Sequence, residues 1–276
     1  MTAEPAPAEH DSAAAADDST NDTRPSGNSR GRGVRRRVSL RTLYTWHVKP
    51  VLWRLMNPGA TPEDYYANTI VTRLRRGEGH PAIGPRTRTV REPTELLDIL
   101  KTYDLQPHHV VVDYGCGSFR LGKALIDYLE PRRYWGLDLV DDFLQSGLEW
   151  LGPKLVAEKA PQARVISAES IAEVRAAGPV FILSWHVCSK VPPSRQADYF
   201  GKIIAMMGPS SVALVHFPES VRRTRQSRFS WAESRAAIAA VIHRIDPRLV
   251  VRFAPVTEKI SHGIRQTMVE ISRPPQ

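Results

Sequence analysis

A glycine-rich turn between an apolar strand and a helix contains the residues best suited to bind a ligand. Val110–Val112 is followed by Asp113 and then by Gly115–Gly117, and we expect a helix over Leu121–Leu129. Glycine lets the backbone turn sharply and lets a ligand approach without meeting a Cβ atom. A helix N-terminus adds free N–H groups. Because ligands of open α/β sheets bind at this carboxyl edge, we expect a nucleoside site within residues 110–138.

The spacing of nearby residues separates this site from other nucleotide sites. A dinucleotide fingerprint needs its third glycine at the position of Arg120, and here the next glycine is Gly122. A P-loop is excluded because no Gly-Lys-Ser/Thr sequence follows the turn. Asp138 ends the next apolar strand, 23 residues after Gly115, where a carboxylate that binds a ribose diol belongs. Asp138 could instead cap the helix that follows.

The segment VVVDYGCGSFRLGKALIDYL, followed by YWGLDL, resembles motif I and the post-I acid of the class I S-adenosylmethionine (SAM)-dependent methyltransferases. The resemblance is to bacterial small-molecule members and covers about residues 90–272. It implies SAM as cofactor and a seven-stranded sheet whose last strand is antiparallel. It also implies that Asp113 and the Gly115–Gly117 turn hold the methionine part, and that Asp138 binds the ribose hydroxyls.

The same resemblance implies further contacts with the cofactor. Leu139 is expected beside the adenine, and Arg120 near the methionine carboxylate or a neighbouring acid. Many relatives end the third strand in an acid that meets the adenine amino group, whereas this chain has Ser167 or Ala168 there and Glu169 slightly later. The expected cofactor-binding residues are Asp113, Gly115, Cys116, Gly117, Arg120, Asp138, Leu139, Glu169 and Trp185.

Two histidines at strand ends are the candidate catalytic residues. Displacement at a sulfonium needs an oriented nucleophile about 3 Å from the methyl group, and some acceptors also need a base. His186 follows the fourth expected strand and His216 ends the fifth. Each could instead be a hydrogen-bonded structural histidine. By the resemblance, Lys190 stands where relatives often have histidine, so a base cannot simply be carried over from the family.

A small-molecule hydroxyl, in a sugar or a secondary metabolite, is the favoured methyl acceptor. No Asp/Asn-Pro-Pro-Tyr/Phe sequence follows the fourth strand, which argues against methylation of adenine or cytosine amino groups. The arginines of residues 222–228 could flank the acceptor entrance and favour a phosphorylated or acidic substrate. Two alternatives stay open: an RNA methyltransferase that uses the basic N-terminal arm, and a non-catalytic membrane-associated protein with the same fold.

Alternating apolar strands and amphipathic helices from residue 108 onward must position these residues. The expected strands are His109–Tyr114, Tyr134–Asp138, Arg164–Ser167, Val180–Trp185, Ser211–Phe217, Leu249–Phe253 and Gln266–Ser272. The expected helices are Leu121–Leu129, Asp142–Leu151, Ile171–Ala176, Ser194–Met207 and Trp231–Ile245. This alternation predicts an α/β fold, with a Rossmann-like, mostly parallel sheet, helices on both faces and an N-terminal helical extension.

The residues before this domain divide into a tail and a helical extension. Residues 1–38 have few large apolar side chains and end in an arginine run, so we expect a disordered, basic-ended tail. Residues 39–106 are expected to form a helical N-terminal cap, and residues 107–274 the methyltransferase domain. Leu40–Met56 predicts a basic amphipathic helix, broken near Pro50, whose apolar face packs on the folded domain or lies on an anionic membrane.

Composition limits the partners and the location of the protein. The net charge is +9, and arginines concentrate between Arg30 and Arg41, which suggests weak contact with an anionic membrane or nucleic acid. No stretch approaches the roughly 18 apolar residues of a membrane span. Because residues 1–30 also lack a signal-peptide pattern, we expect a cytoplasmic protein. Cys116 and Cys188 form no CxxC pair, so no disulfide and no metal site are expected.

Overall fold

The computed structural model describes residue 44 and residues 48–60, 64–65, 68–69, 71–72, 94–227 and 230–274. The expected disordered tail and the arginines between Arg30 and Arg41 lie outside the described residues. So does Arg228 of the expected basic entrance. Within the expected helical cap of residues 39–106, the described residues 64–65, 68–69 and 71–72 are helical.

A mixed sheet of seven strands organises the described residues from 111 to 272. Its order is β3-β2-β1-β4-β5-β9-β8, and β9 runs antiparallel to both of its neighbours. The strands are β1 (Val111–Tyr114), β2 (Tyr134–Asp138), β3 (Gln162–Val165), β4 (Phe181–Ser184), β5 (Val212–Glu219), β8 (Val250–Ser261) and β9 (Ile264–Ser272). The expected Rossmann-like, mostly parallel sheet is confirmed.

The central strands are apolar because helices cover both of their faces. Every residue of β1 (VVDY) and β4 (FILS) is buried. A strand that is buried on both faces needs a nearly continuous apolar sequence, whereas a strand with one solvated face alternates. Asp113 is the charged exception in β1, and it pairs with Gly136 of β2 and Leu183 of β4. The sheet therefore holds a carboxylate at its centre.

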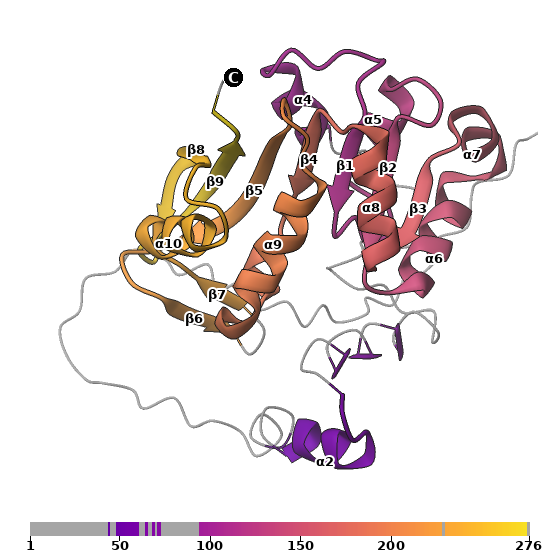
Figure 1. Cartoon of the computed structure of the whole chain (residues 1–276). Helices are drawn as coiled ribbons and strands as arrows, with labels where there is room; N and C mark the ends of the chain where they lie inside the picture. Colours follow the sequence, from indigo (N-terminus) through magenta and orange to yellow (C-terminus); the bar gives the residue numbers. More distant parts are fainter. Residues whose placement is uncertain are drawn as a thin grey trace, which may run out of the picture. The chain divides into compact units, whose positions relative to one another are not determined.

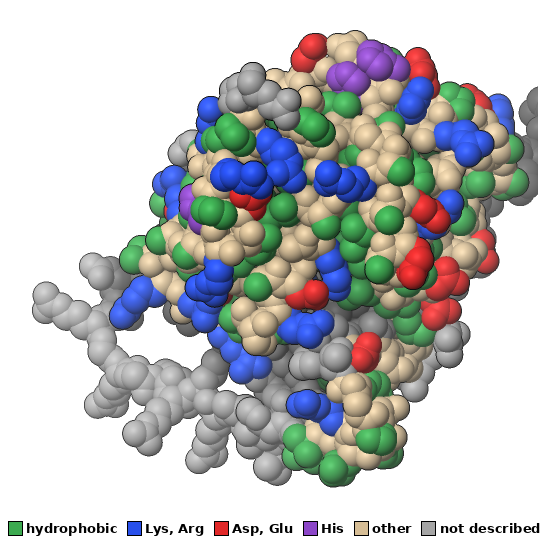
Figure 2. Space-filling model, in the orientation of Figure 1, with side chains coloured by type: hydrophobic (Ala, Val, Ile, Leu, Met, Phe, Trp, Pro, Cys, Tyr) green, Lys and Arg blue, Asp and Glu red, His purple; other side chains and the backbone are tan. Residues whose placement is uncertain are grey.

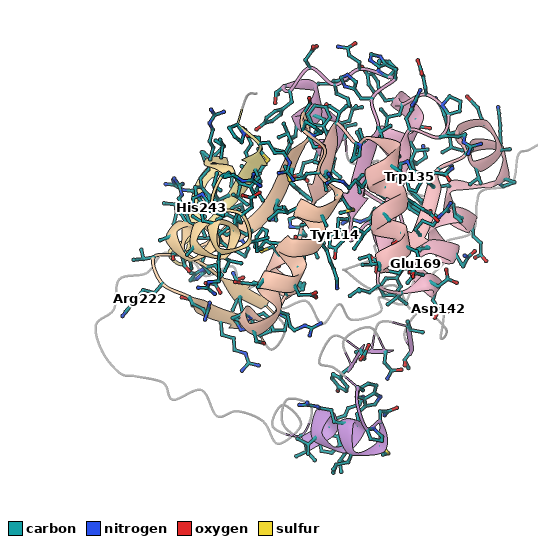
Figure 3. All side chains as sticks on the ribbon, in the orientation of Figure 1. Tyr114, Trp135, Asp142, Glu169, Arg222 and His243 are labelled. Carbon is teal, nitrogen blue, oxygen red and sulfur yellow. The ribbon has the colours of Figure 1, made fainter. Side chains whose placement is uncertain are left out.

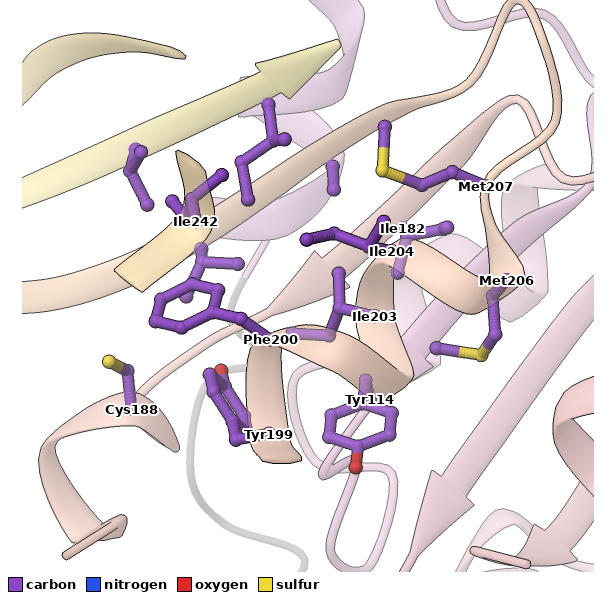
Figure 4. Packing of buried hydrophobic residues seen from close by; sticks show 14 of the residues in the cluster. Tyr114, Ile182, Cys188, Tyr199, Phe200, Ile203, Ile204, Met206, Met207 and Ile242 are labelled. Carbon is purple, nitrogen blue, oxygen red and sulfur yellow. The ribbon is translucent and has the colours of Figure 1, made fainter. Parts of the chain in front are cut away.

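Three helices cover one face of the sheet: α8 (Ala168–Ala177), α9 (Gln196–Met206) and α10 (Arg235–Ile245) (Figure 1). Figure 4 shows Tyr199, Phe200 and Ile203 of α9 packed with Ile182 of β4. Four helices contribute to the apolar cluster on the other face: α4 (Glu95–Lys101), α5 (Lys123–Tyr128), α6 (Asp141–Leu151) and α7 (Pro153–Lys159). Helices on both faces were expected, and the structure confirms this arrangement.

Local sequence explains where α8 begins and ends. Ser167 caps its N-terminus, because the Ser167 hydroxyl accepts the Ser170 N–H at 3.1 Å and the Ser170 hydroxyl accepts the Ser167 N–H at 2.9 Å. Gly178 ends the helix at a φ of +68°, in the left-handed region that glycine adopts without cost. The start of α8 is therefore fixed directly after β3.

Several expected elements have other bounds in the structure: β3 is Gln162–Val165 rather than Arg164–Ser167, and β8 continues to Ser261 rather than ending at Phe253. The helix after the glycine turn begins at Lys123 rather than Leu121, so a longer loop separates it from Gly117. Trp231 lies in β7 (Ser230–Ala232), which pairs with β6 (Thr224–Ser227), and α10 begins only at Arg235. Helix α7 was not expected, although Pro153 near its start is a common helix signal.

The N-terminal extension contains α2 (Lys49–Met56), with Pro50 in its first turn. The expected packing of its apolar face on the folded domain is not seen among the described residues, since Val51, Leu55 and Met56 are exposed. Helix α4 does pack on the sheet through Leu96 and Leu100, which are fully buried. Within the described residues, no helix combines the length and apolar character needed to cross a membrane.

Candidate functional site

The parallel strands β1, β2, β4 and β5 bring their carboxyl ends to one edge of the sheet. Asp113 precedes the last residue of β1, Asp138 ends β2, and Ser184 ends β4. Figure 3 labels Asp142 and Glu169 near this edge, in the first turns of α6 and α8. The residues that the sequence selected on separate strands therefore lie along one edge.

The turn after β1 has the backbone that its glycines predicted. Gly115 has a φ of +86° and Gly117 a φ of +57°, both in the left-handed region. The N–H groups of Gly115 and Cys116 donate to the Leu137 carbonyl at 2.7 and 3.1 Å, which ties the turn to β2. A side chain on Gly115 would collide with the isopropyl group of Val187 in the loop after β4. The turn therefore remains open only with glycine at this position.

Phe119 anchors the loop between the turn and α5. Its backbone has a φ of +60°, unusual for a bulky residue, and its side chain is completely buried. The ring occupies space that Gly136 of β2 and Gly147 of α6 leave open, and it packs edge-on against Tyr134 at 6.0 Å. The sequence analysis missed Phe119. The closest signal was the pair of glycines, one in a strand and one in a helix, which together make room for its ring.

Asp113 is held by a hydroxyl from the neighbouring strand. The Tyr134 hydroxyl donates to Asp113 Oδ2 at 2.8 Å, and both residues are buried. Burial raises the pKa of Asp113 to about 6, the Tyr134 hydrogen bond opposes that rise, and the charge of Asp138 adds to it. Gly122 is the glycine that does not fit the spacing of a dinucleotide fingerprint. Because it has no side chain, the Tyr134 hydroxyl can occupy the space beside it.

Gly122→Ala is expected to lower the free energy of unfolding by about 1–3 kcal/mol through overpacking. The backbone at Gly122 is right-handed helical, with a φ of −75°, so the cost comes from the Tyr134 hydroxyl and not from strain. Urea denaturation of the wild type, both single variants and the Gly122→Ala/Tyr134→Phe double variant measures this coupling. The cost of Gly122→Ala should be smaller in the Tyr134→Phe background than in the wild type, but not zero, because Cζ of the ring also lies 2.7 Å from the added Cβ. An equal cost of Gly122→Ala in both backgrounds would contradict the assignment.

The Asp138 carboxylate holds the glycine turn through a hydrogen bond and can still accept a hydrogen bond from a ligand. Its Oδ2 accepts the Gly117 N–H at 2.9 Å, and its Oδ1 accepts the Val140 N–H at 3.4 Å. Burial raises the pKa of Asp138 to about 6, against the lowering effect of these backbone hydrogen bonds. A carboxylate has about four acceptor sites, and the N–H groups of Gly117, Val140 and Leu139 use up to three of them. The remaining capacity can accept a ribose hydroxyl.

Apolar side chains flank Asp138 at the surface. Leu139 is exposed directly after β2, and Val165, which pairs with Asp138 in the sheet, is exposed at the end of β3. Glu169 is exposed in the first turn of α8, and hydrogen bonds from its own N–H and from the Ser167 side chain lower its pKa. This arrangement provides two apolar contacts and one acceptor for a planar heterocycle. Val165 was missed because its position looked like an ordinary strand residue.

A second cluster lies after β4 and on β5. The rings of Trp185 and His216 are 4.7 Å apart, and His186 stands edge-on to His216 at 4.4 Å. Trp185 and His216 are buried, whereas His186 is exposed and has a φ of +59°. Such a left-handed backbone at a non-glycine residue is often found at functional sites. The two candidate catalytic histidines therefore lie together, and Trp185 accompanies them.

Two nitrogens in this cluster have no hydrogen-bond partner among the described residues. They are Trp185 Nε1, which can only donate, and His216 Nδ1. The side chain of Gln266 on β9 interacts with His216 in a way that favours the protonated imidazole. Burial lowers the pKa of His216 to about 3, with His186 adding to the effect and Gln266 opposing it, so His216 is neutral near pH 7. Each of these two nitrogens can hydrogen-bond a water molecule or a polar group of a ligand.

The charges around His186 come from three different elements. Partial desolvation of its ring lowers the pKa of His186, Glu95 of α4 opposes the shift, and Arg120 and Lys190 add to it. Arg120 is half-buried in the loop after the glycine turn, and it forms no ion pair with a described residue. Its expected role at the methionine carboxylate stays a prediction.

A short hydrogen-bond chain fixes the end of β4. The Tyr199 hydroxyl donates to the Ser184 hydroxyl at 2.6 Å, and Ser184 donates to the Tyr114 carbonyl at 2.8 Å. Helix α9 thereby holds the ends of β1 and β4 together. The loop that carries Trp185 and His186 starts from this rigid point.

The expected site residues thus form two groups. The first surrounds the glycine turn and contains Asp113, Gly115, Cys116, Gly117, Arg120, Asp138, Leu139 and Glu169. The Cys116 side chain is buried in the apolar cluster, so only its backbone can meet a ligand. The second group contains Trp185, His186 and His216. Among the residues with described positions, no cluster of His, Cys, Asp and Glu could hold a metal ion.

No protein-family model and no curated protein sequence match the chain. Solved structures resemble it at low identity. A SAM-dependent methyltransferase from Leishmania major is 14% identical, with a TM-score of 0.52 over 80% of this chain and 89% of that chain. The small RNA methyltransferase HEN1 is 18% identical, with a TM-score of 0.50 over 70% of this chain and 27% of that chain. Magnesium protoporphyrin IX methyltransferase from Synechocystis PCC 6803 is 11% identical, with a TM-score of 0.48 over 83% of this chain and 93% of that chain.

At these identities the likeness concerns the fold. Combined with the strand order and the antiparallel β9, the Leishmania major and HEN1 structures show that the chain has the Rossmann-like fold of the class I SAM-dependent methyltransferases. The fold implied by the sequence resemblance is confirmed.

Proposed function

We propose that this protein is a SAM-dependent methyltransferase that methylates a hydroxyl group of a small molecule. The observation that carries the proposal is the pair of carboxylates, Asp113 and Asp138, on either side of a left-handed glycine turn at the carboxyl edge of the sheet. In this proposal residues 107–274 form the catalytic domain, and residues 39–106 contribute the cap through α4.

The residues at the glycine turn fit the parts of SAM. Asp138 would accept a hydrogen bond from a ribose hydroxyl while it keeps its bond to the Gly117 N–H. Asp113 would face the ammonium group of the methionine part, and Arg120 its carboxylate. Leu139 and Val165 would contact the adenine, with Glu169 beside its amino group. In these assignments, each charged residue of the turn meets a group of SAM that has the opposite charge or that donates a hydrogen bond to it.

The histidine cluster supports a hydroxyl as acceptor. A hydroxyl can accept one hydrogen bond and donate another, which complements the unpaired Trp185 Nε1–H and the unpaired His216 Nδ1. Gln266 would keep the other nitrogen of His216 protonated, so that Nδ1 stays an acceptor. Trp185, expected at the cofactor, is thus proposed to bind the acceptor instead.

Bound SAM supplies a methyl group on a positively charged sulfur, which keeps the electron pair of the broken C–S bond as the acceptor oxygen takes the methyl group. The oxygen must lose its proton, and we propose that His216 Nδ1 receives it. Because the pKa of His216 is only about 3, we propose that it orients the hydroxyl and passes the proton on rather than storing it. His186, edge-on to His216 and exposed, connects this position with solvent.

His216→Ala is expected to lower kcat by about 10²–10⁴-fold while leaving the Kd for SAM unchanged. The assay incubates the full-length protein with methyl-labelled SAM and, in parallel, with hydroxylated small molecules, amines and RNA, and it quantifies S-adenosylhomocysteine and labelled products by mass spectrometry. His243→Ala, whose ring contacts the Leu249 carbonyl away from this cluster, is the matched control. Label found only in RNA, or only on amines, would contradict the proposed acceptor class. An unchanged kcat in His216→Ala would contradict the role of His216.

The affinity for SAM is expected to fall as pH is lowered through about 6. Both carboxyls have a pKa raised to about 6, so they are ionised above this value and protonated below it. Each protonation weakens the interaction with SAM by up to about tenfold per pH unit. Folding responds in the opposite direction: the stability contributed by the raised pKa values is fully present below pH 3.8 and is lost as pH rises to about 6. Calorimetric titrations with SAM from about pH 5 to 8 measure this fall in affinity. A Kd for SAM that stays constant across that range would contradict the prediction.

A further inference from the structure

Helix α2 presents an exposed apolar face. Its aliphatic residues follow the spacing i, i+3, i+4, i+7 and i+8, which aligns side chains along one side of a helix. Leu55 is 74% exposed and Met56 73%, and the remaining three are exposed by 45% or more. The five residues of this apolar face are Val48, Val51, Leu52, Leu55 and Met56. A contiguous apolar surface of this kind marks an interaction site.

The opposite side of α2 carries its contacts with the rest of the chain. The Trp53 ring stands edge-on to the Tyr65 ring at 5.3 Å, and Tyr65 is buried. The Asn57 side chain donates to the Trp53 carbonyl at 2.7 Å and closes the end of the helix. Because Trp53 is the residue that turns inward, the apolar face of α2 is the side left without a covering partner among the described residues.

Charge indicates what covers this face. Residues 30–56 contain eight lysines and arginines and no aspartate or glutamate. Lys49 and Arg54 belong to α2 itself, and Figure 2 shows basic side chains beside the apolar ones where Figure 1 has this helix. A helix with a continuous aliphatic face and flanking cations matches the interface of an anionic bilayer, since the face enters the acyl region and the cations meet lipid phosphates.

We propose that α2 docks this protein on an anionic membrane surface. Nucleic acid would use the cations but leave five aliphatic side chains in water. A second copy of this helix would cover the aliphatic side chains but bring like charges together. Only an anionic lipid surface satisfies both features of residues 30–56. The proposal is independent of the methyltransferase assignment.

The experiment is sedimentation of the full-length protein with vesicles of mixed phosphatidylcholine and phosphatidylglycerol, and with vesicles of phosphatidylcholine alone. Wild type is expected to bind the anionic vesicles at least about tenfold more tightly than the neutral ones. Leu55→Asp/Met56→Asp should lower anionic binding by at least about tenfold. The matched control is Val221→Asp/Ile260→Asp, which changes two other exposed apolar residues and should bind like wild type.

The outcomes separate the possible occupants. SAM affinity and thermal stability of Leu55→Asp/Met56→Asp should equal those of wild type, which shows that any loss of vesicle binding is local. Equal binding of both double variants to anionic vesicles would overturn the proposal. Salt-sensitive binding to a single-stranded RNA without vesicle binding would also overturn it. A dimer seen by light scattering, and abolished only by Leu55→Asp/Met56→Asp, would overturn it too.

Discussion

Phe119→Ala is expected to lower the free energy of unfolding by about 3–5 kcal/mol, the range for truncating a fully buried phenylalanine. The ring fills the space left by Gly136 and Gly147 and packs against Tyr134, so its removal leaves a cavity that these backbones cannot close. Because the same residue sets the path of the loop after Gly117, the affinity for SAM should also fall, by at least about tenfold. Urea denaturation and calorimetry measure the two effects.

Phe200→Ala is the matched control for this prediction. Phe200 is also completely buried, but it packs from α9 on the opposite face of the sheet. Its truncation should cost a similar amount of stability and leave the affinity for SAM close to that of the wild type, measured at a temperature where both variants are folded. Equal loss of SAM affinity in the two variants would show that Phe119 acts only through global stability.

Much of the sheet could be predicted because its central strands are short apolar runs between glycine, proline and charged residues. The sequence boundaries of β2 agree with the structure, and those of β1 and β4 differ only at their ends. Asp113 and Asp138 were identified from their places at strand ends, which depends on chain spacing alone. Parallel strands then bring such ends to one edge without further information.

The remainder of the site depends on contacts between distant residues, which spacing does not reveal. The left-handed backbone of Phe119 is maintained by Gly136 and Gly147, both far along the chain. Gln266 approaches His216 because β9 runs antiparallel beside β5, with Gln266 paired to Pro218. Trp231 resembled a helix start, yet pairing with Arg225 in the β6–β7 hairpin determines its conformation. In each case tertiary packing outweighs local preference.

Asp138→Ala is expected to weaken the binding of SAM by at least about 100-fold. The substitution removes the proposed hydrogen bond from the ribose to a charged acceptor, which contributes about 1.5–3 kcal/mol, and every 1.4 kcal/mol is about tenfold in Kd. It also removes the acceptor of the Gly117 N–H, which loosens the turn. Asp138→Asn keeps one oxygen for that N–H and should fold normally, with a loss of about tenfold.

The central claim is that the glycine turn and Asp138 form a SAM site, and calorimetric titration of the full-length protein with SAM and S-adenosylhomocysteine tests it most directly. Asp141→Ala, which removes an exposed carboxylate three residues further on, is the control. Both compounds are expected to bind saturably to wild type and Asp141→Ala, more weakly to Asp138→Asn, and at least about 100-fold more weakly to folded Asp138→Ala. No binding to wild type, or the same Kd in wild type and Asp138→Ala, would contradict the claim.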